Sequence, residues 1–195
     1  MKRLFLPLAL PLALAALAGC VSFGSEPPPF LMTLTPDAQV ESGTNRTAAI
    51  GQAITIARPE VPQKLTTNRL PVQTADTTIA FLADAVWVAT PNQLFRSLLS
   101  EVVAARTGRV VLDPATYTED PGTIVRGQLH EFGLDARTRE AVILYDAAIT
   151  TAEGVRTRRF EAREPVGAED ARSVSEALNR AANRIAIEFS DWLAV

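Results

Sequence analysis

Apolar and polar residues alternate with two different periods along this chain, and the period changes from segment to segment. A period of two residues predicts a strand with one buried face, whereas an apolar stripe that recurs every three to four residues predicts a helix. The alternating segments are short and are bounded by Pro, Gly and polar loops, which is typical of strands. We therefore expect strands at residues 30–35, 50–57, 69–74, 77–83, 109–112, 123–134, 141–150 and 155–163.

Several of these strands contain residues that modify regular pairing. Pro71 lacks a backbone N–H, so its strand is expected at an edge of the sheet or at a bulge. Gly127 and Gly133 are expected to mark bulges in their strand. Glu153 and Gly154 form a tight-turn sequence, so the last two strands are expected to pair as a hairpin.

The helix expected at residues 91–107 has the best-defined ends. Thr90 and Gln93 have the spacing of a capping box, and Pro91 suits the first helical position. Gly108 follows as the expected left-handed residue that ends the helix. The apolar stripe expected to face the core consists of Leu94, Phe95, Leu98, Leu99, Val102 and Val103.

A second helix is expected at residues 168–193, where apolar residues recur at helical spacing and charged residues occupy the other side. Two amphipathic helices and eight short strands predict an α+β fold. We expect a two-layer sandwich in which a mainly antiparallel or mixed sheet carries two long helices packed on one face. The apolar stripe of the second helix consists of Val174, Leu178, Ala181, Ile185, Phe189 and Trp192.

The first twenty residues have the pattern of a bacterial export signal. Two basic residues precede an uncharged apolar run at 4–18, which as a helix of about 22 Å is too short to span a hydrocarbon core of about 30 Å. The sequence Leu-Ala-Gly-Cys at 17–20 then resembles the lipobox of bacterial lipoproteins. This resemblance implies cleavage between Gly19 and Cys20, a diacylglycerol on the Cys20 thiol and an acyl chain on its new amine. The alternative is an ordinary signal peptide with an incidental cysteine.

The expected processing divides the chain into three parts. Residues 1–19 form the lipoprotein signal peptide, residues 20–29 the lipidated cysteine and a Pro-rich tether, and residues 30–195 a single periplasmic domain. Val21 stands where an Asp would retain an enteric lipoprotein at the inner membrane, so we expect the periplasmic face of the outer membrane. Loss of two basic residues with the signal takes the net charge from −3 to −5. This mild acidity argues against nucleic acid as a partner.

Residues that could support catalysis are few. His130 is the single histidine and falls within an expected strand, there is no G-x-S-x-G motif, and the candidate serines fall within helix patterns. No set of ligands has the spacing of a zinc site, and no phosphate-binding or dinucleotide-binding motif is present. We therefore expect no enzyme, no catalytic residue, no metal and no cofactor other than the acyl chains on Cys20. A lipid-anchored hydrolase would need His130 and a serine to meet in one cleft.

Two features suggest contact with a partner. Arg156, Arg158, Arg159 and Arg163 form a short basic group, and the first three are candidate contacts for lipid head groups or for an acidic partner. The alternative is a solvated edge strand on which charges block unwanted pairing, and Glu161 nearby favours it. Trp87 is either an exposed recognition residue or a core residue, and its apolar neighbours favour the core.

The order of these features resembles a known family. After the lipobox come Phe-Leu-Met-Thr-Leu at 30–34, Ala-Ile-Thr-Ile-Ala-Arg-Pro-Glu-Val-Pro at 53–62 and an Asn-Arg pair at 68–69. Trp87 precedes the first helix, and Trp-Leu at 192–193 ends the second. Over nearly all of the mature chain this arrangement is similar to the ABC-type transport auxiliary lipoproteins, a family that includes the lipoprotein of the paraquat-inducible lipid transport system.

The resemblance implies a non-enzymatic auxiliary component of an ABC system that moves lipid or another hydrophobic substrate between membranes. Its expected partners are the membrane, a mammalian-cell-entry-type substrate-binding protein, and the ABC permease and ATPase; a homo-oligomer is compatible with this role. The alternative is an envelope lipoprotein that regulates another machine, such as a peptidoglycan synthase or an outer-membrane assembly factor. The short tether favours the first interpretation, because an activator that reaches across the peptidoglycan tends to need a longer one.

Overall fold

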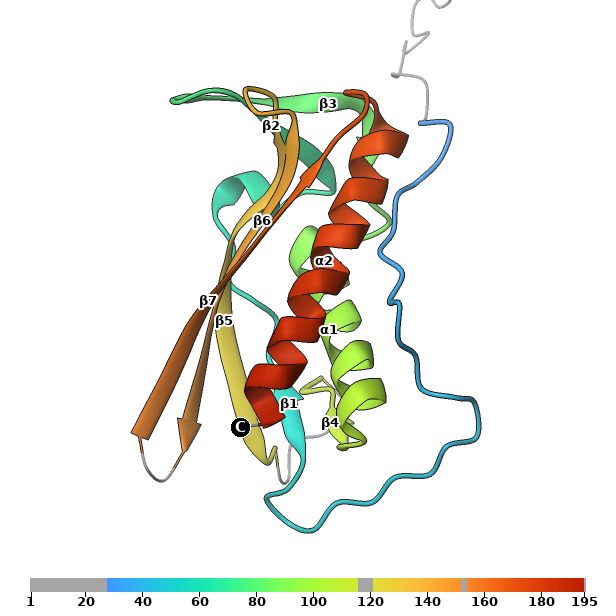
Figure 1. Ribbon diagram of the computed structural model, residues 1–195, viewed down its shortest axis with the longest axis vertical. Helices are drawn as coiled ribbons and strands as arrows, with labels where there is room; N and C mark the ends of the chain where they lie inside the picture. Colours follow the sequence, from blue (N-terminus) through green and yellow to red (C-terminus); the bar gives the residue numbers. More distant parts are fainter. Residues whose placement is uncertain (1–27, 116–120, 152–153, 195) are drawn as a thin grey trace, which may run out of the picture.

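The computed structural model describes residues 28–115, 121–151 and 154–194. In these residues seven strands form one mixed sheet, and two helices lie side by side against one of its faces (Figure 1). The predicted α+β sandwich is confirmed, and each predicted strand from residue 50 onward has a counterpart with somewhat different bounds. The helices are α1 Pro91–Thr107 and α2 Ala171–Ala194, with a short 3-10 helix η2 at Gln63–Leu65; the strands are β1 Ile54–Ile56, β2 Arg69–Ala75, β3 Thr78–Val86, β4 Val111–Leu112, β5 Thr123–Asp135, β6 Glu140–Thr151 and β7 Gly154–Pro165.

Strand β5 organises the sheet, because both of its edges are paired. One edge pairs antiparallel with β6, which in turn pairs antiparallel with β7, as the predicted hairpin requires; Glu153 of its turn lies outside the described residues. The other edge pairs in parallel with β1 along its first part and with β2 along its last part. Between them the Glu60 N–H donates to the Gly127 carbonyl at 2.9 Å, and the Glu60 carbonyl accepts from the Leu129 N–H at 2.8 Å. Strands β4 and β3 extend the sheet from β1 and β2.

The face of the sheet towards the helices holds the hydrophobic core. Tyr145 of β6 lies 5.3 Å from Phe95 of α1 and 6.2 Å from Phe160 of β7, measured between ring centroids. Phe189 of α2 completes the cluster at 6.1 Å from Tyr145. The predicted apolar stripes of both helices face this core, and all their residues are buried except one partly buried leucine of α1. Trp87 is fully buried, so its core interpretation is confirmed and the recognition interpretation is wrong.

The two ends of α1 match the sequence unequally. Gly108 adopts the expected left-handed conformation with φ of 70° and ends the helix. The predicted capping box is wrong, because the Thr90 hydroxyl donates to the Asn92 side-chain oxygen at 2.8 Å and not to the helix backbone. Asn92 is itself held by the Pro59 carbonyl, which accepts from its amide at 3.0 Å. A tertiary contact has therefore replaced the local cap.

Helix α2 begins at Ala171, three residues later than predicted. Asp170 precedes it and accepts from the Ser173 N–H at 2.9 Å and from the Ser173 hydroxyl at 3.0 Å. These bonds satisfy an otherwise unpaired donor of the first turn and lower the pKa of the Asp170 carboxyl. Apolar periodicity alone does not locate this cap.

The glycines of β5 do not mark bulges, contrary to the prediction. The register between β5 and β6 shifts at His130, so the extra residue of the bulge is there. Gly127 and Gly133 lie in regular pairing, where neighbouring backbone comes close; a Cβ at Gly133 would lie 2.3 Å from the Pro71 carbonyl oxygen. Pro71 adjoins a register shift in β2, which confirms the bulge interpretation, although β2 lies inside the sheet and not at its edge.

Residues 30–35 do not form the predicted strand. Only Met32 makes a bridge, to Trp87. Residues 30–40, here called the strap, run along the helices as an extended segment (Figure 1). Asn183 of α2 is buried and takes the place of a neighbouring strand. Its side-chain amide donates to the Thr35 carbonyl at 2.9 Å, and its side-chain oxygen accepts from the backbone N–H two residues further on at 2.8 Å. Because helix side chains satisfy these backbone groups, the segment needs no strand partner.

Candidate functional site

The sheet face that points away from α1 and α2, here called the open face, carries most of the candidate site. Neither long helix covers it, and η2 only borders it (Figure 1). Successive side chains of a strand point to opposite faces, so alternate residues of β5, β6 and β7 form rows across it. Its exposed or partly exposed members include Arg126, Gln128, Glu131, Glu140, Leu144, Asp146, Ala148, Thr157, Arg159, Glu161 and Arg163.

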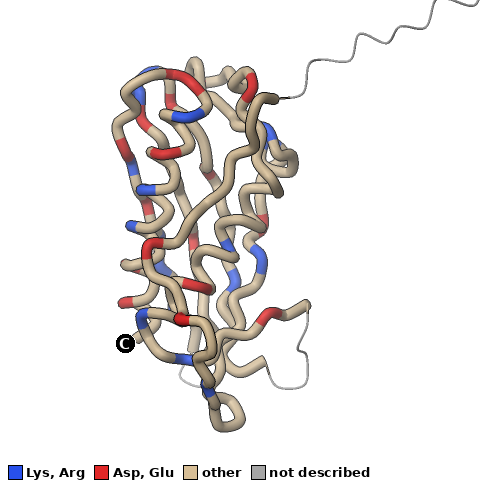
Figure 2. The backbone as a smooth tube through the Cα atoms, turned by 90° about the vertical axis from the view of Figure 1, so that its right-hand side faces the viewer, with Lys and Arg blue, Asp and Glu red and all other residues tan. Residues whose placement is uncertain are grey.

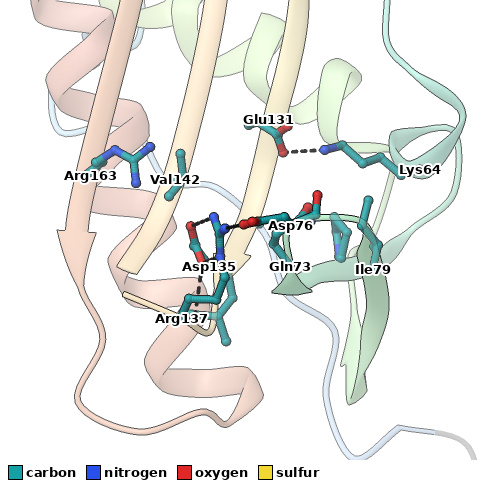
Figure 3. Close-up of a pocket in the computed structure, with 12 residues that line it drawn as sticks. Lys64, Gln73, Asp76, Ile79, Glu131, Asp135, Arg137, Val142 and Arg163 are labelled. Atoms are coloured by element: carbon teal, nitrogen blue, oxygen red, sulfur yellow. Dashed lines mark hydrogen bonds and ion pairs between the residues drawn. The ribbon is translucent and has the colours of Figure 1, made fainter. Parts of the chain in front are cut away.

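A charged cavity of about 300 Å³ lies on the open face, beside the pairing of β2 with β5, and Ile79 of β3 also lines it (Figure 3). Asp135, at the end of β5, is bound by the Arg137 guanidinium with 2.7 Å between Nη2 and Oδ2. This bond keeps the pKa of the Asp135 carboxyl below its usual range. Arg137 also pairs with Asp76 of the β2–β3 turn, and Lys64 of η2 reaches across to Glu131 of β5. Four separate segments therefore contribute charge to one cavity.

The charges in this cavity balance one another. Arg163 of β7, which lines the same cavity, pairs with Glu161 at 2.7 Å and with Glu140 at 3.3 Å. A ligand would have to exchange with existing ion pairs, so the cavity does not attract one sign of charge over long range. Its lining contains no hydroxyl, thiol or imidazole group. The arrangement suits recognition of polar groups more than nucleophilic chemistry.

The single histidine joins a second cluster on the open face. His130 Nε2 lies 2.9 Å from Asp146 Oδ2, and Arg159 binds both oxygens of the same carboxylate at 2.7 Å. The bonds from Arg159, with a smaller contribution from His130, lower the pKa of Asp146 to about 2. The serine hydroxyls of α1 and α2 donate to helix carbonyls or to Asp170, except the buried Ser100 hydroxyl, which has no hydrogen-bond partner in the described part of the chain, and none bonds to His130. In the described residues the Ser–His arrangement of a hydrolase is therefore not assembled.

Strand alternation separates the predicted basic group. Arg159 points to the open face, where its carboxylate partner on β6 neutralises it. Arg156 lies on the helix side, where its guanidinium donates to the Trp192 carbonyl at 3.2 Å. Arg158 lies on the same side, 4.8 Å from the Phe160 ring centroid. The three residues form no common basic patch, and their contact with head groups or an acidic partner stays a prediction.

Of the charged residues that line the cavity, the sequence drew attention only to Arg163, as a member of the basic group on its strand. Asp135 and Arg137 are two residues apart at a strand end, which is the one local signal that could have drawn attention to them. Lys64 and Glu131 are 67 residues apart, and only the strand pairing brings them together.

The expected lipidation site cannot be compared with the structure, whereas metal ligands and membrane-spanning helices can be searched for in the described residues. Gly19 and Cys20 lie outside the described residues, so cleavage and lipidation stay predictions. Across the three described ranges no group of three His, Cys or acidic side chains is placed to hold a metal ion. In the same part of the chain, no helix has the length and apolar character needed to cross a membrane.

Comparison with known proteins identifies the family. The chain matches the family described as ABC-type transport auxiliary lipoprotein component over residues 33–188. A crystal structure of a DUF330-family protein from Xanthomonas campestris superposes with a TM-score of 0.64 at 16% identity, covering 84% of this chain and 94% of that one. A crystal structure of an uncharacterized protein gives a TM-score of 0.65 at 13% identity over 76% and 96% of the two chains. No curated protein matches the chain.

The two structural likenesses, at such low identity, support the fold alone. The family match, in contrast, extends from the strap through every strand and into the last turns of α2. It agrees with the resemblance that the sequence suggested. This chain belongs to the family of ABC-type transport auxiliary lipoprotein components.

Proposed function

We propose that this protein is the lipid-anchored periplasmic auxiliary component of a mammalian-cell-entry-type ABC system that moves lipid or another hydrophobic substrate between membranes. The family match over residues 33–188 carries the proposal. The charged cavity supports it, because its paired charges suit recognition and it offers no hydroxyl, thiol or imidazole nucleophile. The protein would then act by holding and positioning other components and not by catalysis.

The anchor in this proposal is Cys20. Two or three acyl chains, at about 0.8 kcal/mol for each buried CH₂, hold a protein on a membrane almost permanently. Val21 after the cysteine favours the periplasmic face of the outer membrane. A Cys20→Ala variant should therefore leave the outer-membrane fraction, as an uncut or a soluble periplasmic form, whereas wild-type protein should sediment with outer-membrane vesicles. Wild-type levels of the variant in that fraction would contradict the anchor.

We assign partner docking to the open face, because α1, α2 and the strap occupy the other side of the sheet (Figure 1). The test uses the acylated protein in native membranes with a photo-crosslinking residue in place of Glu161, which is exposed on the open face. The matched control replaces Glu176, an exposed glutamate of α2. Mass spectrometry identifies what each position captures.

The proposal predicts that Glu161 captures the mammalian-cell-entry-type binding protein or its permease and that Glu176 does not. Capture of a peptidoglycan synthase or an outer-membrane assembly factor at Glu161 would contradict it and favour the regulator interpretation. Equal capture of the transporter at both positions would leave the function standing and contradict the assignment of the open face.

A further inference from the structure

Three apolar side chains are exposed where the described chain begins. Phe30, Leu31 and Val88 are 37%, 54% and 50% exposed. They surround the bridge between the strap and the end of β3, in which the Met32 N–H donates to the Val86 carbonyl at 2.8 Å and the Val88 N–H donates to the Met32 carbonyl at 2.9 Å. Alternation at this bridge buries Met32 and turns Leu31 and Val88 outward. We call Phe30, Leu31 and Val88 the anchor-side patch.

The anchor-side patch lies at one end of the molecule. The Arg172 guanidinium, in the first turn of α2, is 5.4 Å from the Phe30 ring centroid. At the other end, the neighbours of Ile50 line a hollow with Leu193 and Ala194, the last residues of α2. The 24 residues of α2 separate the two ends by about 36 Å. Residues 28–36 include no acidic or basic residue, and Figure 2 shows this end of the strap in tan.

Chain length determines which end the membrane can reach. Seven residues, and therefore eight residue-to-residue steps, separate Cys20 from Pro28, where the described chain begins. At about 3.3 Å per residue they extend at most about 26 Å, which is less than the length of α2. We propose that the anchor-side patch contacts the bilayer that holds the acyl chains of Cys20, which fixes the orientation of the domain on the membrane. This inference rests on the lipid anchor of the proposed function.

Three side chains suffice for such a contact because the anchor is already in the membrane. A short tether raises the effective concentration of the patch at the bilayer to the millimolar range, so a weak interaction becomes well populated. Arg172 can keep its charge at the lipid phosphates while its stem and the Phe30 ring lie at the apolar boundary. The opposite end, with the β6–β7 hairpin, would then point into the periplasm, where partners approach (Figure 1).

The test uses full-length acylated protein reconstituted in phosphatidylethanolamine–phosphatidylglycerol vesicles. A nitrobenzoxadiazole dye is attached to Leu31→Cys or Val88→Cys, and the acylated Cys20 offers no competing thiol. Ile50→Cys is the matched control, because Ile50 is 92% exposed and lies at the far end of α2. Flotation first establishes that each variant is anchored, and lipids brominated on their acyl chains then serve as contact quenchers.

An interfacial apolar patch enters the boundary of the acyl region by about 5–10 Å, so we expect brominated lipids to lower dye emission at least about twofold at positions 31 and 88 and by less than about a tenth at position 50. Anchored protein without quenching at 31 and 88 would overturn the proposal and leave the anchor intact. Blue-shifted but unquenched emission would show that protein, such as a second copy, covers the patch, and would also overturn it. Failure to float would overturn the anchor and this inference together.

Discussion

The two faces of the sheet are built from alternate residues of the same strands, yet different forces stabilise them. Towards the helices, Tyr145, Phe160 and Phe189 are buried with ring centroids 5.7–6.2 Å apart. Towards the open side, the side chains of Asp146 and Arg159 pair while remaining 36% and 62% exposed. Removal of a buried phenyl ring costs about 3–5 kcal/mol, whereas an exposed ion pair contributes about 1 kcal/mol or less. The helix face therefore carries the stability of the fold, and the open face is free to vary for recognition.

The largest expected effect is the loss of a ring from the helix face. Phe189 contacts Tyr145, Phe160 and Trp192, so Phe189→Ala leaves a cavity between α2 and the sheet. We expect it to lower the free energy of unfolding by about 4 kcal/mol, as measured by urea denaturation followed by circular dichroism. Glu161→Gln on the open face is the control and should change stability by about 0.5 kcal/mol or less. A loss below about 1 kcal/mol for Phe189→Ala would contradict the conclusion that the helix face carries the stability of the fold.

Gly133 lies on the open face, yet we expect a substitution there to destabilise the protein as a substitution in the core would. A Cβ there would lie 2.3 Å from the Pro71 carbonyl oxygen and 3.0 Å from the proline ring. Neither atom can move without shifting β2, so Gly133→Ala should destabilise the protein by about 1–3 kcal/mol. Gly167→Ala is the matched control, because no atom lies within 4 Å of its added methyl group. Equal thermal melting temperatures for the two variants would show that β2 and β5 can separate locally without loss.

The parts of the fold that follow from neighbouring residues were predictable. Helical stripes, the left-handed Gly108 and the β6–β7 hairpin depend on residues only a few positions apart, and they are present. The strap is an exception, because its alternating sequence predicts a strand that does not form. Its backbone partner is Asn183, which lies 148 residues from Thr35 in the sequence. Here a helix side chain forms the backbone hydrogen bonds that a neighbouring strand would otherwise form. The residues around the strap give no sign of this distant partner.

The charged cavity was not predictable, because it depends on where β5 bulges. Simple alternation would place Glu131 on the helix side with Leu129. The extra residue at His130 reverses the alternation and turns Glu131 to the open face, where it meets Lys64. The glycines that suggested bulges mark close backbone approach instead. Without the bulge at His130, simple alternation would put Glu131 and Asp135, two of the three acidic or basic residues of β5, on the wrong face.

The smallest expected effect is a pH dependence confined to the open face. The pKa of Asp146 is about 2 in the folded protein, below its ordinary value of 3.8, chiefly because Arg159 binds the carboxylate and secondarily because His130 does. The folded state therefore keeps this carboxylate charged after the unfolded chain has taken up a proton. Its stabilising contribution is fully present above pH 3.8 and is lost as the pH falls towards 2.

Because the carboxylate is partly exposed, solvent screening limits this contribution to about 1 kcal/mol. Between pH 5 and pH 2 we expect the unfolding free energy of the wild type to fall by about 1 kcal/mol more than that of Asp146→Asn. Arg159→Gln should remove most of the same difference, since Arg159 is the main cause of the lowered pKa. Urea denaturation across this pH range measures the difference in unfolding free energy. An NMR titration of the Asp146 carboxyl measures its pKa in the folded protein. Identical pH profiles for the wild type and Asp146→Asn would mean that the pair adds nothing to folding. The contrast between the two faces would then be sharper than the geometry implies, because stability would come from the helix side alone.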